Sequence, residues 1–237
     1  MKKLILLAIM PLSIAWTQAV SPFYKAAVAA PPATPVVIES ADSLLVNFDD
    51  PTFSVTVGSN ANRALIVGVV ADKASVIATV SSDVDGPFTN FCTRTTTTGD
   101  QDISLWYITG VTSGSHTVTI DFSTTGSGGA FLYELSNAHQ TTPIRDTVSG
   151  VQEWGQTISA TITSTANDIC VDFMGGTQQS GTYTPDAGQT NDMHETGQYP
   201  YTFSSRETGA ASVQMGWGWS SPETEMLQLI ASLRPPS

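Results

Sequence analysis

Apolar and polar residues alternate with a period of two along several short segments of the chain. Residues 52–57 place Phe53 and Val55 on one face and serine or threonine on the other, and residues 116–122 and 157–163 repeat this pattern. Successive side chains of a strand point to opposite faces, so each segment predicts a strand with one buried and one solvated side. The solvated side consists mainly of threonine and serine, which suit a half-exposed pleated surface.

Other segments are apolar on both faces. Residues 64–70 (ALIVGVV) predict a central strand that lies between two layers, and residues 226–233 predict a similar closing strand. Glycine-rich turn signals recur about every ten residues, and helical periodicity is absent. We therefore expect an all-β protein: a single antiparallel two-sheet β-sandwich, jelly-roll-like, over residues 36–237.

The first thirty-five residues have a different character. Lys2 and Lys3 precede an apolar run at 4–16, and residues 31–35 (PPATP) predict a stiff extended linker. The basic start, the short apolar run and the small residues that follow are typical of a secretory signal. The run is too short to span a bilayer as a helix. If the segment is retained instead, it is an apolar arm that needs a partner to cover it.

Composition narrows the classes of function. The chain has 237 residues, of which 13% are charged and 41% are hydrophobic, and its formal net charge is −12. A chain this apolar can bury enough surface to fold, so disorder is excluded. Nucleic-acid binding needs a clustered positive footprint, and nine scattered basic residues do not supply one.

Aromatic residues are the candidate binding residues. Trp106 is adjacent to Tyr107, so one of the two points outward from a strand, and Trp154 lies in a polar connection. Outward aromatic rings can stack against a sugar. The alternating Trp217 and Trp219 fit either such a platform or a layer of the core, and we favour the core. The candidate ligand-binding residues are Trp106, Trp154, Tyr199 and Tyr201.

The two cysteines, Cys92 and Cys170, leave two alternatives open. In an oxidising compartment they can pair and link two strands. Two separate buried thiols fit equally well, because free cysteine is a common core residue.

The sequence offers no catalytic or metal-binding pattern. His194 begins a segment that resembles HExxH but lacks the second histidine and a helix to display it. Asp83–Gly86 opens like a calcium loop, yet the later ligands are missing, and Asp-Gly more simply predicts a hairpin turn. We expect no cofactor, no metal and no enzymatic activity; a glycosidase would need a recognisable pair of inward carboxylates.

Six segments of the chain carry a resemblance when they are taken in order: 62–69, 105–107, 114–120, 133–144, 209–215 and 229–235. Together they resemble an uncharacterised jelly-roll-like β-sandwich family, found as modules in secreted bacterial surface proteins and as stand-alone proteins in tailed phages. The resemblance implies a β-sandwich fold and a non-catalytic, surface-displayed role, and it carries over no catalytic residues. The chain differs from the family in the acidic turn at 83–87.

Two functional hypotheses follow. The first is a structural protein of a virion surface, of capsid-decoration or fibre type, whose partners are copies of itself or capsid and fibre neighbours. The second is a secreted bacterial carbohydrate-binding or adhesion module with a cleaved signal and a glycan ligand. Neither requires a membrane span or nucleic acid.

Overall fold

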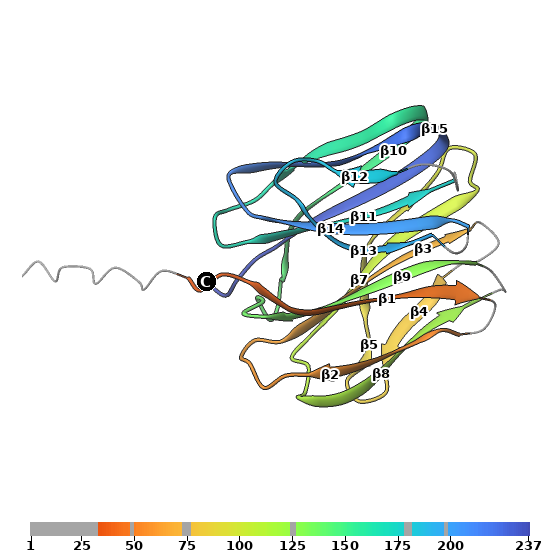
Figure 1. Cartoon of the computed structure of the whole chain (residues 1–237). Helices are drawn as coiled ribbons and strands as arrows, with labels where there is room; N and C mark the ends of the chain where they lie inside the picture. Colours follow the sequence, from red (N-terminus) through yellow and green to blue (C-terminus); the bar gives the residue numbers. More distant parts are fainter. Residues whose placement is uncertain (1–32, 48–49, 73–76, 124–126, 178–181, 197–198) are drawn as a thin grey trace, which may run out of the picture. The chain divides into compact units, whose positions relative to one another are not determined.

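The computed structural model describes residues 33–47, 50–72, 77–123, 127–177, 182–196 and 199–237. The predicted leader therefore lies outside the described residues, except for its last three positions. Residues 33–237 form one compact unit. The regular structure of the described residues consists of antiparallel strands, which confirms the all-β prediction (Figure 1). Val36 is already buried, and its amide donates to the Asn167 carbonyl at 3.1 Å.

A five-stranded sheet occupies the middle of the unit, and we call it the middle sheet (Figure 1). Two of its three inner strands, β9 and β3, are buried along nearly their whole length. In spatial order its strands are β1 (Val37–Asn47), β9 (Ser127–Ser136), β3 (Ala64–Asp72), β7 (Gln101–Thr109) and β6 (Thr89–Thr95).

A four-stranded sheet packs on one face of the middle sheet. Phe53 and Val118 point inward from it and meet Leu65 and Val67 of β3 in one core. The opposite side chains of β2 are exposed, as the alternation at 52–57 predicts. In spatial order the strands are β2 (Thr52–Val57), β8 (Gly114–Phe122), β4 (Ile77–Ser82) and β5 (Gly86–Pro87).

A six-stranded sheet packs on the other face. Ile66 and Tyr133 of the middle sheet meet Phe173, Leu227 and Leu229 of this sheet in a second core. In spatial order the main strands are β10 (Ile144–Thr163), β15 (Ser212–Leu233), β11 (Ile169–Gly176), β14 (Tyr201–Thr208) and β13 (Thr190–Glu195), and β12 (Tyr183–Pro185) pairs with β15.

The long strands β10 and β15 fold back over their own sheet. A Cβ at Gly150 would lie 3.3 Å from Cδ1 of Ile158, eight positions later in β10. An unbent strand would separate these positions by about 26 Å. Trp154, at the bend, has a positive φ of 51°. Gly155–Thr163 of β10, β12 and Ser212–Trp219 of β15 therefore form a further layer, which we call the folded-back layer.

The folded-back layer buries the outer face of the six-stranded sheet. Trp217 and Trp219 pack with Met174, Phe203 and Met226. Both tryptophans are buried, at 0% and 6% relative exposure, so the interpretation of these residues as core is confirmed. A second group packs the same way, and it consists of Ile162, Cys170, Val213, Met215 and Ile230.

The single two-sheet sandwich is the part of the fold prediction that is wrong, and the jelly-roll topology is not confirmed. The chain stacks more layers than two, because β3 and β9 are apolar on both faces and each face needs its own cover. The apolar run at 64–70 already indicated a strand that is buried on both faces. The outer face of β11 is buried as well, with Cys170 and Met174 on either side of Asp172, and it requires the folded-back layer as its cover.

Gly68 sets how closely the middle and six-stranded sheets approach. A Cβ there would lie 2.3 Å from Cδ1 of the buried Phe173. We predict that Gly68→Ala lowers the free energy of unfolding by about 1–3 kcal/mol through overpacking, measured by urea denaturation. Gly218→Ala is the matched control, since its nearest new neighbour is 3.9 Å away. Equal stability of the two variants would contradict this packing.

Candidate functional site

The structure places two of the four predicted binding aromatics in cores. Trp106 packs against the core of the four-stranded sheet, and its Nε1 donates to Ser104 Oγ at 2.9 Å. Tyr107 packs against the core on the opposite side. Because both faces of the middle sheet are covered, both residues of this pair are partly buried. Tyr201 is 5% exposed and belongs to the core beneath the folded-back layer.

The other two predicted aromatics are on the surface. Trp154 is 77% exposed at the bend of β10, and Tyr199 is 37% exposed before β14. The carbonyl of Tyr199 accepts from Ser127 Oγ at 2.8 Å, which ties it to the middle sheet. Burial raises the pKa of Tyr199, and the nearby Asp100 carboxylate adds to this effect.

Both cysteines are free in the structure, which contains no disulfide between Cys92 and Cys170. Cys92 is half-buried on β6 of the middle sheet, and Cys170 is buried on β11 of the six-stranded sheet. Burial raises the pKa of both thiols. Raised thiol pKa values are typical of inert structural cysteines.

A serine, a histidine and an aspartate meet at the turn between β4 and β5. His116 Nδ1 lies 3.1 Å from Ser82 Oγ and 3.3 Å from Asp85 Oδ2, and Nε2 lies 2.8 Å from the Thr112 carbonyl. A nucleophilic triad needs the serine and the acid on different ring nitrogens. Here both share Nδ1, so this arrangement fastens the turn to β8. Gly86, with a φ of 86°, completes the hairpin turn that Asp-Gly predicts.

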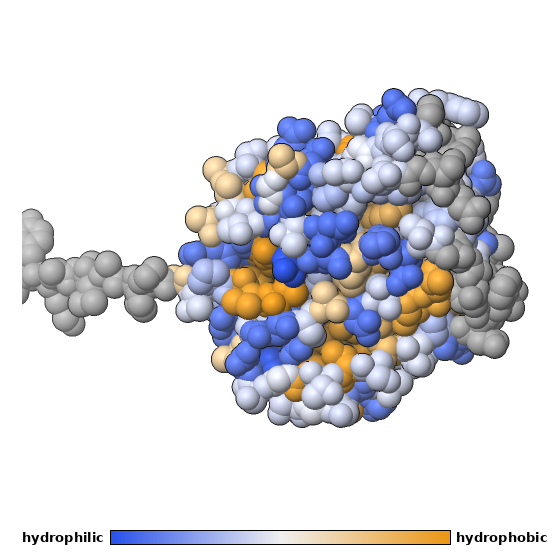
Figure 2. Space-filling model, viewed as in Figure 1, coloured by the Kyte–Doolittle hydropathy of each residue, from blue (hydrophilic) through white to orange (hydrophobic). Residues whose placement is uncertain are grey.

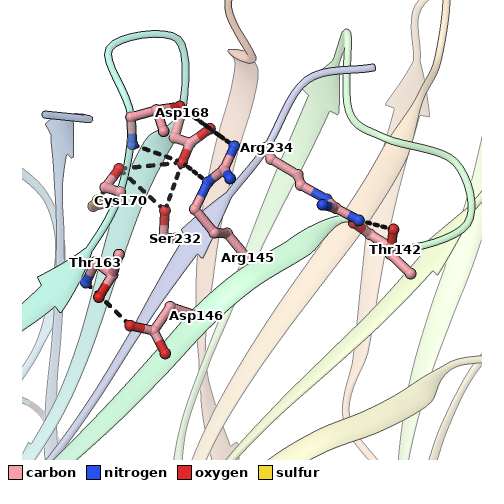
Figure 3. A network of polar contacts seen from close by, with 10 residues as sticks. Thr142, Arg145, Asp146, Thr163, Asp168, Cys170, Ser232 and Arg234 are labelled. Carbon is pink, nitrogen blue, oxygen red and sulfur yellow. Dashed lines mark hydrogen bonds and ion pairs between the residues drawn. The ribbon is translucent and has the colours of Figure 1, made fainter. Parts of the chain in front are cut away.

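A charged pair joins β10 to the start of β11. The Arg145 guanidinium donates to both oxygens of Asp168, at 3.1 Å for the Nη2–Oδ1 bond, and Ser232 Oγ donates to Oδ2 at 3.0 Å (Figure 3). Burial raises the pKa of Asp168, but the hydrogen bonds from Arg145, Thr165 and Ser232 outweigh it, so the pKa is lowered. The pair is neutralised within the fold and acts as an anchor.

Asp172 is a buried carboxyl between β11 and the folded-back layer. Trp217 Nε1 and Gln228 Nε2 donate to its Oδ2 at 3.0 and 2.8 Å. Burial raises the pKa of Asp172 to about 7, although these two hydrogen bonds oppose the shift, and the charge of Asp186 adds to it. Its Oδ1 has no hydrogen-bond partner among the described residues. Asp172 therefore links the two layers as a group that resists ionisation.

A cavity of about 270 Å³ lies at the edge of the folded-back layer. Residues from β12, β13 and β14 meet there. A half-buried Tyr183 ring packs on the ring of Phe203, with centroids 4.0 Å apart and an interplanar angle of 31°. The lining consists of Thr182, Tyr183, Asn191, His194, Thr196 and Phe203.

A β-bulge in β13 brings two polar side chains to this cavity. Asn191 pairs with Ser205 and His194 pairs with Phe203, and the register shifts between them at Asp192. Without the extra residue, positions three apart would point to opposite faces. With it, Asn191 and His194 share the outer face with Phe203, while Asp192 accepts from Tyr133 Oη at 2.9 Å.

Sequence reasoning missed Tyr183 and Asn191 as site residues, and it considered His194 only as a metal ligand. A weak signal existed, since Tyr183 and His194 both lie in polar segments where a core role is hard to assign. In the described ranges, no group of three or more His, Cys, Asp or Glu side chains is placed to hold a metal ion. No helix in those ranges is long and apolar enough to cross a membrane.

No family model, curated protein or solved structure matches this chain. The resemblance to the jelly-roll-like surface family therefore stays a prediction.

We predict that ionisation of Asp172 destabilises the folded chain. Unfolded aspartate titrates near pH 4. The folded pKa of Asp172 is about 7, so the unfolded chain releases this proton first as pH rises. As pH rises from about 4 to about 7, the free energy of unfolding of the wild type should therefore fall relative to that of Asp172→Asn, because the variant has no proton to lose at this position.

The measurement is thermal unfolding followed by circular dichroism across that pH range. The Tm of Asp172→Asn minus the Tm of the wild type should increase with pH. Asp121→Asn, which also removes one negative charge but from an exposed position on β8, is the control. A Tm difference for Asp172→Asn that stays constant with pH would contradict the assignment.

Proposed function

We propose that the protein is a non-catalytic structural component of a larger surface assembly, of capsid-decoration or fibre type on a virion. The observation that carries this proposal is the open edge of the middle sheet, which β1 forms. β1 pairs with β9 on one side, and no described strand pairs with its other side. Val37 is 42% exposed, and Ile38, Leu44 and Leu45 are only partly buried, whereas Glu39 and Asp42 between them are exposed. Figure 2 shows apolar patches near the two ends of β1, with hydrophilic residues between them.

A strand edge with unpaired backbone N–H and C=O groups favours pairing with another chain. The partner that fits is a second copy, because the same edge on two copies is self-complementary about a twofold axis. The internal ties of the acidic and histidine side chains support a non-catalytic role, since Asp168, Asp85 and His116 bond within the fold. The net charge of −12 supports an outward-facing position, away from packaged nucleic acid.

A charge at the β1 edge should weaken self-association. We expect Val37→Lys to raise the dimer dissociation constant at least tenfold, as lysine at an exposed strand edge opposes pairing. Val84→Lys is the matched control, because Val84 is 54% exposed in the turn between β4 and β5. Sedimentation velocity over a concentration series measures the effect. A wild type that stays monomeric, or equal weakening by both variants, would contradict the proposed interface.

A secreted carbohydrate-binding or adhesion module is the second candidate, and the cavity beside β13 favours it. Gradient fractionation of a producing culture, with intact-mass analysis of the protein, separates the two candidates. The structural role predicts protein that sediments with particles and retains the segment 1–35. Protein found only in the medium, with its leader removed, would contradict the virion role and favour the second candidate.

A further inference from the structure

We propose that the cavity between β12 and β13 binds one ring of a neutral saccharide. This inference concerns the ligand of that cavity, and it does not depend on whether the protein is carried on a particle or released from cells. The aromatic floor, the polar rim and the charge of the lining each contribute a separate argument.

The floor is a supported aromatic ring. Tyr183 is half-buried, so part of its ring reaches the cavity, and Phe203 holds it from behind with centroids 4.0 Å apart. Phe203 in turn packs on the buried Trp217, with centroids 5.6 Å apart. This series of rings fixes the orientation of Tyr183 before any ligand arrives. A held aromatic ring provides the flat apolar surface against which the C–H face of a sugar packs.

The rim combines hydrogen-bond donors with acceptors. Asn191 carries an amide that both donates and accepts, and Thr182 and Thr196 carry hydroxyls that do the same. His194 adds ring nitrogens on the same face, directly across the strand pair from Phe203. Asn191 and His194 are both exposed, so their polar groups are available to a ligand. A sugar hydroxyl, which also donates and accepts, matches this set.

The scarcity of charged groups in the lining favours a neutral ligand. No carboxylate, ammonium or guanidinium is among the lining residues that the structure describes. An anionic sugar would find no lysine or arginine partner among these residues, and the net charge of −12 would repel it. The cavity of about 270 Å³ is slightly smaller than the pockets that enclose drug-sized ligands, of roughly 300–1,000 Å³, so it fits a single ring.

The test is a titration of the full chain with free glucose, galactose, mannose and N-acetylglucosamine, and with glucuronic acid as the charged comparison. Binding is followed by backbone amide shifts in NMR spectra, and the dissociation constants come from the same titrations. We expect at least one neutral sugar to shift amides of β12 and β13, and glucuronic acid to bind more weakly than glucose.

The double variant Asn191→Ala/His194→Ala removes two exposed side chains, so it should fold, and its melting curve verifies this. We expect it to raise the dissociation constant of the bound sugar at least tenfold. Tyr183→Leu tests the aromatic floor separately and should weaken binding as well. The controls are Asn90→Ala, at an exposed asparagine on β6, and Trp154→Ala, at the most exposed aromatic among the described residues, and both should bind as the wild type does.

Three results would overturn the proposal. The first is the absence of amide shifts in β12 and β13 with every neutral sugar of the panel. The second is binding that survives Asn191→Ala/His194→Ala but is lost in Trp154→Ala, which would move the site to the bend of β10. The third is tighter binding of glucuronic acid than of glucose, because the cavity would then recognise charge.

Discussion

Burial of the middle sheet on both faces is the constraint on which the rest of the structure depends. β3 and β9 direct alternate side chains into two different cores, so that Ile66 meets the six-stranded sheet and Val67 meets the four-stranded sheet. Each face, left uncovered, would expose a continuous apolar surface, at a cost of about 25 cal/mol for every Å². The two flanking sheets follow from this need. The folded-back layer meets the same need on the outer face of the six-stranded sheet, where it covers buried side chains such as Met174 of β11.

Polar groups inside the stack serve to join layers. Tyr133 connects the middle sheet to β13 through Asp192, Asp172 connects β11 to the folded-back layer, and Asp168 closes one end through Arg145. An unbonded polar group is costly to bury, so these contacts help to fix one arrangement of the layers. The surfaces left for partners are then the strand edges and the cavity where the folded-back layer ends, and both proposals concern these places.

Local pattern reveals strands but not how far a strand runs before it bends. Alternation at 52–57 and the apolar run at 64–70 predicted β2 and β3 and their burial, and the large residues at 217 and 219 were correctly interpreted as core. The bend that folds β10 back depends on a positive φ at Trp154. Positive φ is uncommon for residues other than glycine, so the sequence does not predict it at a tryptophan. The cavity depends on a bulge at Asp192 and on a pairing of β12 with β15, and neither leaves a periodic signal. The partial burial of Trp106 was not predicted, because a two-sheet sandwich leaves one face of its strand exposed.

Native-state hydrogen exchange tests the layered arrangement most directly. If the middle sheet is the doubly covered centre, amides of β3 and β9 exchange only through global unfolding, with the full dependence on denaturant. Amides of Gly155–Thr163 and Ser212–Trp219 should exchange through smaller openings, because the folded-back layer is covered on one side only. Exchange of β3 and β9 that is as easy as that of the folded-back layer would contradict the account.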